Sequence, residues 1–399
     1  MPSSPPRRAG IDLGGSEMGN RVVVLGVGLT HFEREPSQAM DAVAEEAATA
    51  ALKDAGMLYK DIQIGFVGNV YQPGAAPIAF YPLAKTGIPI TRIDIACASA
   101  SRGAQLGAYL IEGGAYDTCL VLGVERMPKG MVPMPIGPGA LSMENDLLYD
   151  GMVGLITMPG AYAYKAVRYM HDHGARPEHF AQVSVKNHRN ACLNPNAMYR
   201  KEMSLEEVMN SRMVAYPITL YECCANSNGA TAVVLCSEKK AREYTDDPVF
   251  LTGWGEASVR FDFADPVESG LSDGDTEAAA KRAYEKAGIG PEDVDVVQVH
   301  DAFSFGEILQ IELLGLCARG EAAALTWEGE TEIDGRIPVN TDGGLLGCGH
   351  PIGATGGRMI AELYWQLKGK AGRRQVEGAK VGVLQNSGLG GSNVMILQK

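Results

Sequence analysis

Apolar runs rich in β-branched residues alternate along this chain with segments of helical periodicity. RVVVLGVGLT at 21–30 is followed by a helical pattern over residues 40–55, and a second apolar run covers residues 62–70. Apolar positions that recur every three to four residues indicate an amphipathic helix, whereas short apolar runs indicate strands. Strands and helices that alternate in this way predict an α/β fold.

Two stretches of this pattern occur twice. AALKDAGMLYKDIQIGFVGNV at 50–70 is similar to RAYEKAGIGPEDVDVVQVHDA at 282–302. IDIACASASRGAQLGAYLIEGG at 93–114 is similar to GHPIGATGGRMIAELYWQLKG at 349–369. Repetition of whole elements indicates internal duplication. We therefore expect two βαβαβ-like halves that pack as one pseudo-symmetric unit.

The duplication suggests a division of the chain into four parts. These are a flexible tail over 1–20, an N-terminal half over 21–125, an inserted loop domain over 126–246 that also carries the end of the first half, and a C-terminal half over 247–399. An insertion of this size usually covers or shapes a site. Within it, PMPIGPG at 133–139 is predicted to be an irregular loop, and PGAYAYKAVRYMHDHG at 159–174 a helix.

Composition and charge restrict the function classes. Of the 399 residues, 46% are hydrophobic and 21% are charged, which is ordinary for a folded globular protein. A net charge of −13 argues against binding to nucleic acid, which needs a basic surface to neutralise phosphates. No apolar run reaches the ~18 residues of a membrane span, and the first twenty residues lack a secretory signal. We expect neither nucleic acid nor membrane as a partner.

Cysteine and histidine spacings add further exclusions. The eight cysteines lack the spacings of a disulfide framework or a metal site, and the adjacent Cys223 and Cys224 cannot form an ordinary disulfide. The seven histidines include no HExxH, and the glycines near residue 26 do not form GxGxxG. These patterns predict a reduced, cytoplasmic protein with no metal and no dinucleotide cofactor.

Cys97 is the first candidate for chemistry. It follows an apolar strand pattern and directly precedes a helix start rich in small residues. The positive end of a helix dipole lowers the pKa of a thiol and favours the nucleophilic thiolate. A buried, inert thiol is the alternative for any single cysteine, but the position of Cys97 favours a nucleophile.

Two histidines have comparable positions. His350 precedes a helix in the element that repeats the Cys97 element, so the two helix N-termini can converge and give a thiol and a base. His300 ends the strand pattern VDVVQVHDAF, at the sheet edge where α/β proteins commonly place catalytic groups. Asp301 is suited to orient His300 or a loop amide. A structural role is the alternative for each histidine.

Five segments together resemble the thiolase superfamily, most closely its sterol-carrier-protein-associated branch. They are KTGIPITRIDIACASAS around Cys97, LGVERMPKG at 122–130, VSVKNHRNACLNPNA at 183–197, VHDAFSFGEILQIELLGLC at 299–317 and GGLLGCGHPIGATGGR at 343–358. The resemblance covers about residues 20–399. Such a set is far more specific than any single motif.

This resemblance implies a five-layered αβαβα fold and covalent acyl transfer. Cys97 would carry the acyl group as a thioester, His350 would activate that thiol, and His300 would polarise the oxygen of the second acyl group through a bound water. Backbone N–H groups of Cys97 and Gly388 would hold the thioester oxygen. Coenzyme A would be substrate or product, with no permanently bound cofactor. The resemblance also implies a homodimer through the sheet near TCLVLGV, or a dimer of dimers.

The chain departs from the family pattern at the second catalytic cysteine. Where many thiolases carry a CxG loop, this chain has LQNSGLGG, so that Asn386 is expected to line the substrate site without acting as a base. Where the pattern of the sterol-carrier branch is HDCF, this chain has HDAF, with Ala302 in place of the cysteine. Cys348 in GCGHP is a candidate replacement, although a small buried residue is the simpler interpretation.

Three functions fit these residues. The first is a thiolase-type acyl-CoA C-acyltransferase that cleaves a 3-oxoacyl-CoA or catalyses the reverse Claisen condensation. The second is a thiolase-like acyltransferase or retro-aldolase that works with a small zinc-ribbon/OB-fold partner, which VNTDGG at 339–344 suggests. The third is a non-catalytic acyl-CoA- or lipid-binding relative. Basic side chains that could meet CoA phosphates, or simply be solvated, are Arg126, Lys129, Lys165 and Arg168.

Overall fold

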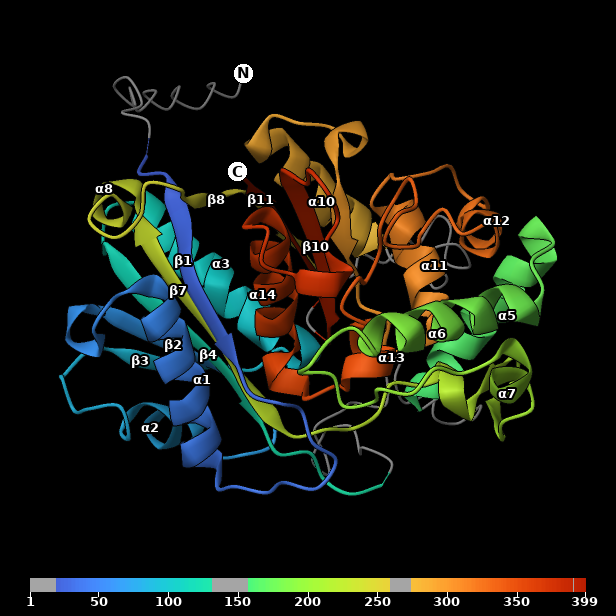
Figure 1. The fold of residues 1–399 in the computed structure, drawn as a ribbon, viewed down its shortest axis with the longest axis horizontal. Coiled ribbons are helices and arrows are strands. Elements are labelled where there is room, and N and C mark those ends of the chain that lie inside the picture. Colours follow the sequence, from blue (N-terminus) through green and yellow to red (C-terminus); the bar gives the residue numbers. More distant parts are fainter. Residues whose placement is uncertain (1–18, 131–156, 259–273, 390) are drawn as a thin grey trace, which may run out of the picture.

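The computed structural model describes residues 19–130, 157–258, 274–389 and 391–399 (Figure 1). All but two residues of the tail predicted over 1–20, and the whole loop predicted at 133–139, lie outside this range. None of the described helices is long and apolar enough to cross a lipid bilayer.

A nine-stranded mixed sheet runs through the molecule, in the order β3-β2-β4-β7-β1-β8-β11-β10-β9. Its strands are β1 (Val22–Leu29), β2 (Ile64–Gly68), β3 (Ile90–Ile93), β4 (Thr118–Glu125), β7 (Gly229–Ser237), β8 (Val249–Ala257), β9 (Val296–Gln298), β10 (Val381–Gly388) and β11 (Gly391–Gln398). Strands β1 and β8 pair only from Val22 to Val24. The sheet therefore consists of two half-sheets joined at this short seam.

Helices form three layers around the two half-sheets. Helices α1 (Met40–Ala55) and α2 (Ala75–Phe80) cover the outer face of the first half-sheet, and α10 (Gly274–Ala287) and α11 (Ser304–Leu313) cover that of the second. Between the half-sheets lie α3 (Ser99–Glu112) and α14 (Thr355–Leu367), seen side by side in Figure 1. This is the αβαβα layering that the family resemblance implied.

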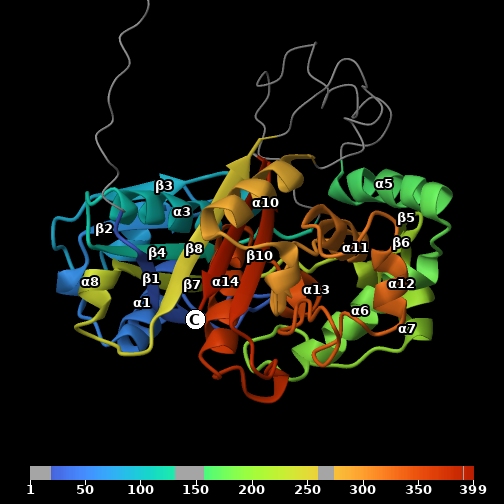
Figure 2. The ribbon, with the colours of Figure 1, turned by 90° about the horizontal axis from the view of Figure 1, so that it is seen from above.

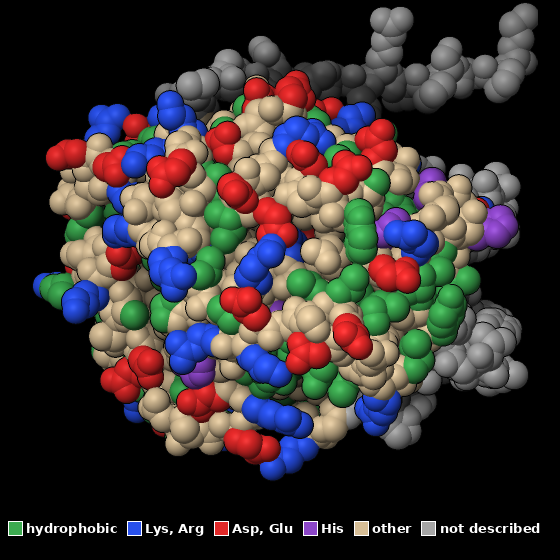
Figure 3. Space-filling model, turned by 45° about the vertical axis from the view of Figure 1, so that its right-hand side comes forward, with side chains coloured by type: hydrophobic (Ala, Val, Ile, Leu, Met, Phe, Trp, Pro, Cys, Tyr) green, Lys and Arg blue, Asp and Glu red, His purple; other side chains and the backbone are tan. Residues whose placement is uncertain are grey.

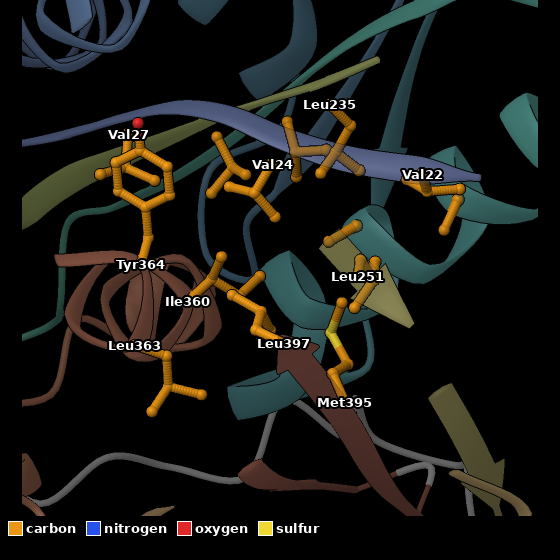
Figure 4. Packing of buried hydrophobic residues seen from close by; sticks show 14 of the residues in the cluster. Val22, Val24, Val27, Leu235, Leu251, Ile360, Leu363, Tyr364, Met395 and Leu397 are labelled. Atoms are coloured by element: carbon orange, nitrogen blue, oxygen red, sulfur yellow. The ribbon is translucent and has the colours of Figure 1, made fainter. Parts of the chain in front are cut away.

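Alternation along the strands assigns their side chains to the layers. In β4, Val121 faces the central helices while Leu120 and Leu122 face the outer ones. In β10, Leu384 faces the centre and Val383 faces outwards. Both faces of these strands are apolar because helices cover both. Figure 4 shows the central core, where side chains of β1 and α14 meet those of β8 and β11.

The predicted duplication is visible in how each half packs its outer helix. A Cβ added to Gly28 of β1 would lie 2.3 Å from the Ala47 carbonyl oxygen of α1. A Cβ added to Gly255 of β8 would lie 2.1 Å from the Ala279 carbonyl oxygen of α10. In both halves a glycine lets an alanine-lined helix lie directly on the strand. The two halves are therefore built in the same way.

The segment between β4 and β7 packs beside the sheet, on the right in Figure 1. Its elements are α5 (Met158–His173), α6 (Pro177–Ala191), α7 (Leu205–Met209) and the two-stranded β5 (Met213–Ala215) and β6 (Ile218–Thr219). Helix α5 contains most of the helix predicted at 159–174 and ends at Gly174, whose φ of 68° closes it. Helix α6 packs against α11, α12 (Ala322–Trp327) and α13 (Gly344–Cys348). The short α8 (Glu238–Ala241) follows β7.

TCLVLGV, near which the resemblance implies a dimer contact through the sheet, is β4, and β4 is paired on both sides, with β2 and β7. A strand with both edges occupied cannot add a partner strand. The free edge of this half-sheet is β3, in which Thr91 and Arg92 are exposed.

Candidate active site

The two repeated elements converge at the start of the central helices. Cys97 lies in the 3₁₀ turn Ala96–Ala98 that leads into α3, and His350 precedes the turn Ile352–Ala354 that leads into α14. These two turns contact each other. Ala96 has a φ of 56°, a left-handed conformation rare for alanine, and its carbonyl accepts from Ser99 Oγ at 2.6 Å. Such strain is typical of functional sites.

Cys97 and His350 form a hydrogen-bonded pair. His350 Nε2 lies 3.1 Å from Cys97 Sγ, and His350 Nδ1 lies 2.7 Å from Thr355 Oγ1. Thr355 donates its hydroxyl hydrogen to the Pro351 carbonyl at 3.1 Å, so its oxygen accepts from Nδ1–H. The neutral ring therefore carries its hydrogen on Nδ1 and presents a bare Nε2 to the thiol.

Burial sets the charge state of this pair. Desolvation, aided by the negative charge of Glu125, raises the pKa of Cys97 to about 12. Desolvation also lowers the pKa of His350 well below its usual value, and the neighbouring His300 ring and the Arg358 guanidinium lower it further. The expected thiolate is thus wrong for the resting site, because the cost of burying a charge exceeds the effect of the helix N-terminus. The pair rests as a neutral thiol and a neutral base.

His300 faces the same centre from the C-terminal half, which also carries His350. It follows β9, and its ring stands at 71° to that of His350 with centroids 5.3 Å apart. Asn386 Nδ2 donates to His300 Nδ1 at 3.1 Å, and Ser101 Oγ donates to Asn386 Oδ1 at 2.8 Å. Burial, followed by the charge of Arg358, lowers the pKa of His300 to about 3. The neutral ring therefore carries its hydrogen on Nε2.

Asn386 and Gly388 occupy different places relative to the site. Asn386 is fully buried and both ends of its amide contact protein, so it orients His300. That it lines the substrate site stays a prediction. Gly388, at the end of β10, lies against the Cys97 turn: a Cβ there would be 2.1 Å from the Ile95 carbonyl oxygen. Only glycine lets the strand end approach the turn this closely.

A buried polar network holds the His300 loop. Asp301 accepts from Asn187 Nδ2 at 2.8 Å and from the Leu345 backbone at 2.7 Å, at the start of α13. Burial and the charge of Glu307 raise the pKa of Asp301 to about 8. Glu307 is paired with Lys186 at 2.7 Å. Asp301 thus anchors loop amides, one of the two roles expected from the sequence.

Several supporting residues were not predicted. Arg358 pairs with Asp342 in the interior, and its positive charge adds to the larger effect of burial in lowering the pKa of both histidines. Glu125 accepts from the Val70 backbone at 2.9 Å and from the Gly353 backbone at 3.0 Å, tying the loop after β2 to the turn before α14. A charged residue inside an apolar run, as in both cases, is the sequence signal that would have found them.

Cys348 is not placed for proton transfer. Its thiol donates to the Asp342 carbonyl at 3.1 Å and accepts from Asn194 Nδ2 at 3.4 Å. The residue is 2% exposed, and burial raises its pKa well above the usual value. It is a small buried residue, as the simpler interpretation had it.

The cluster can also be tested as a metal site. Cys97, His300 and His350 each offer one ligand atom, and these atoms lie within 4.8 Å of one another. In this arrangement His350 Nε2 is bonded to the thiol and His300 Nδ1 to an amide, so a bound ion would have to replace the Cys97 contact. The geometry suits a nucleophile and its base better than a resident metal.

The basic residues named for CoA phosphates are partly engaged elsewhere. Lys129 pairs with Glu35 at 3.0 Å, Arg168 pairs with Asp172, and Arg126 donates to the Gln38 carbonyl. Figure 3 shows one face of the molecule, on which acidic and basic side chains are interspersed. These contacts favour the solvated-surface interpretation for Lys129 and Arg168.

Comparison with known proteins supports the family suggested by the motifs. A thiolase N-terminal domain model matches residues 22–239, and a thiolase C-terminal domain-like model matches residues 269–399. Acetyl-CoA acetyltransferase of Methanothermobacter thermautotrophicus is 39% identical over 92% of this chain and 96% of its own length. Human sterol carrier protein 2 is 36% identical over 95% of this chain and 72% of its own length.

Solved structures agree with the fold. The Ltp2-ChsH2(DUF35) aldolase superposes with a TM-score of 0.81 at 26% identity, covering 96% of this chain and 98% of the other. Human mitochondrial 3-ketoacyl-CoA thiolase superposes with a TM-score of 0.72 at 19% identity, covering 95% and 99%, which shows the fold alone. The domain models, the relatives and the five layers together establish that this chain belongs to the thiolase family and is an acyltransferase of that family.

Proposed function

We propose that the protein is an acyl-CoA C-acyltransferase that forms an acyl thioester on Cys97 and makes or breaks the carbon-carbon bond of a 3-oxoacyl-CoA. The observation that carries this proposal is the contact of 3.1 Å between Cys97 Sγ and a His350 Nε2 that is free to accept a proton. His300 stands beside the pair with the opposite tautomer.

Acylation begins with a neutral pair. As Cys97 Sγ attacks the thioester carbonyl, its proton passes to His350 Nε2, which restores the reactivity that burial removes from the thiol. The backbone N–H groups of Cys97 and Gly388 donate hydrogen bonds to the carbonyl oxygen and stabilise the negative charge that develops on it. The departing CoA thiolate takes the proton from His350, leaving acyl-Cys97.

His300 serves the second substrate. Its Nε2–H, fixed by the Asn386 contact, donates to the acceptor's thioester oxygen, directly or through a water, and stabilises the enolate that forms there. The enolate carbon then attacks acyl-Cys97 and displaces the Cys97 thiolate. Thiolysis is the same sequence in reverse.

The test is acylation of Cys97 itself. Protein mixed with acetyl-CoA or acetoacetyl-CoA should gain one acetyl mass on the peptide that contains Cys97. Cys97→Ala should gain none, while Cys192→Ala should acylate like the wild type, because Cys192 is a free cysteine at the end of α6 outside the Cys97–His300–His350 cluster. Folded wild-type protein without an adduct would sink the proposal.

Assembly belongs to the same proposal. The β3 edge offers unpaired backbone groups over Ile90–Ile93, and two copies could join their sheets there in a homodimer, which could in turn pair as a tetramer. Light scattering of the purified protein should then give a dimer mass, and proline at Thr91 should reduce it. A monomer mass for the active wild-type protein would remove the assembly proposal.

A second candidate is a thiolase-like acyltransferase or retro-aldolase that works with a small OB-fold partner. It is supported by the similarity to the Ltp2-ChsH2(DUF35) aldolase and by the VNTDGG segment, in which Asn340 holds the His300 loop by accepting from the Val299 backbone at 3.0 Å. Activity of the purified chain alone would favour the first candidate. Activity only after co-expression with such a partner would favour the second.

A further inference from the structure

Carbon-carbon chemistry needs a group that moves a proton at the substrate α-carbon, and the two histidines are already committed. His350 Nε2 is bonded to Cys97, and His300 Nδ1 is bonded to Asn386. At the two positions where the family patterns carry a second cysteine, this chain has Asn386 and Ala302. Cys348 points into a separate polar cluster. The remaining free cysteines of the described residues are therefore the candidates for this proton transfer.

The segment after the 3₁₀ turn Leu220–Glu222 passes between the two histidine loops. The Cys224 backbone N–H donates to the Ala302 carbonyl at 2.9 Å, two residues beyond His300. The next carbonyl, that of Ala225, accepts from the His350 backbone at 2.8 Å. Cys224 is thus held to the His300 loop on one side, and its neighbour is held to His350 on the other.

The side chain of Cys224 lies in an apolar environment next to the His300 loop. It packs against an apolar cluster that contains Ala302 and Phe303, and the residue is half-buried. The preceding Cys223 is extended, and its thiol donates instead to the Thr219 carbonyl at 3.3 Å. Cys223 packs against the same cluster with its thiol engaged by Thr219, whereas Cys224 is held beside Ala302 by its backbone bond.

We propose that Cys224 is the catalytic acid and base at the substrate α-carbon, an inference that rests on the proposed acyl-transfer function. In condensation, the Cys224 thiol passes its proton to His350 Nε2, directly or through water, once CoA has left, and the resulting thiolate removes a proton from the α-carbon of the acceptor thioester. The enolate oxygen bonds to His300 Nε2–H, and His350 later returns its proton to the departing Cys97 thiolate. The α-carbon bonds to the acyl carbon as the bond from that carbon to Cys97 Sγ breaks. In cleavage, the Cys224 thiol gives its proton to the departing α-carbon and recovers one from His350, which took it from Cys97.

Electrostatics agree with this geometry. Burial raises the pKa of Cys224 well above its usual value, and the charges of Cys223, Cys97 and Asp301 raise it further. A thiol with a raised pKa is protonated at rest, ready to act as the acid in cleavage, and its thiolate is a stronger base for a weakly acidic α-hydrogen.

The test separates acylation from proton transfer. Wild type, Cys224→Ala, Cys224→Ser and Cys223→Ala are compared for the acetyl adduct on Cys97 and for deuterium uptake into the methyl group of acetyl-CoA in D2O. Both Cys224 variants should keep the adduct and lose at least about 100-fold in deuterium uptake. Cys223→Ala should keep both. Adding Ala302→Cys to Cys224→Ala should restore part of the uptake, since it returns a thiol to the adjacent position.

Each other result counts against Cys224. Deuterium uptake unchanged in Cys224→Ala, a Cys223→Ala variant that loses as much uptake, or a Cys224→Ser variant that loses the adduct overturns the inference. So does an acylating wild type that takes up no deuterium. A wild type that never acylates instead overturns the proposed function, so the two failures are distinguishable.

Discussion

The two histidine loops hold the same residue type in similar burial and still differ in what they offer a substrate. His350 and His300 are 4% and 3% exposed, and desolvation lowers the pKa of both. Thr355 accepts from His350 and leaves a bare nitrogen at Cys97, whereas Asn386 donates to His300 and leaves an N–H. Burial thus removes the charge from both rings, and one neighbouring side chain decides whether each ring accepts or donates a proton.

The strongest test of this comparison removes the accepting ring. His350→Ala should slow iodoacetamide alkylation of Cys97 near neutral pH by about 1000-fold, because a thiol with a pKa of about 12 has almost no thiolate of its own. The fold should persist, as judged by circular dichroism. Equal alkylation in wild type and variant would remove His350 as the base.

Removal of the donating ring should have a different signature. His300→Ala should leave alkylation of Cys97 within about twofold of wild type but reduce acetoacetyl-CoA cleavage by about 100-fold, because the enolate loses its hydrogen-bond donor. Steady-state turnover and alkylation are measured on the same preparation. If both fall together, the two rings do not have separate roles.

Asn386→Asp tests how the His300 tautomer is fixed. A carboxylate accepts where the amide donated, so Nδ1 of His300 should become protonated and its pKa should rise. Turnover should fall by about 30-fold at neutral pH, within the range of general acid–base effects. Nitrogen NMR of histidine-labelled protein should show the changed tautomer, and an unchanged spectrum would contradict the assignment.

Thr355→Val makes the matching change at His350. Valine has a similar shape but cannot accept from Nδ1–H, so the ring should lose its fixed tautomer and alkylation of Cys97 should fall by about tenfold. Thr355 is fully buried, so a thermal melt is the control for stability. A larger loss than in His350→Ala would show that the variant is damaged elsewhere.

The smallest expected effect is that of pH. Because the pKa of His350 lies well below 6.5, the ring stays a neutral base when the pH falls from 8 to 6. The rate of adduct formation on Cys97 should change by less than about twofold, whereas a histidine with an ordinary pKa would lose about fourfold. A fourfold loss centred near pH 6.5 would show that burial does not control this ring.

Most of the helices, strands and site residues could be predicted from the sequence, but the charge states of the site residues could not. The alternation of apolar runs and helical patterns predicted α1 over residues 40–55 and the α/β class, and the repeated elements placed Cys97 and His350 at two helix starts that could meet. The five layers and the grouping of His300 with this pair followed from the family resemblance. The same reasoning predicted a resting thiolate, whereas burial raises the pKa of Cys97 to about 12. The homodimer through the sheet near β4 stays a prediction.

The sequence by itself determines the pattern of apolar and polar positions. That pattern determines which residues form each strand and helix and which residues lie at their ends. Only the tertiary structure decides desolvation and hydrogen-bond partners, because those come from residues far apart in the chain. The thiol and its base are separated by 253 residues, and Ser101 and Asn386 by 285. The pKa of Cys97, the two tautomers and the approach of Cys224 to the His300 loop arise only when the two halves close around the central helices.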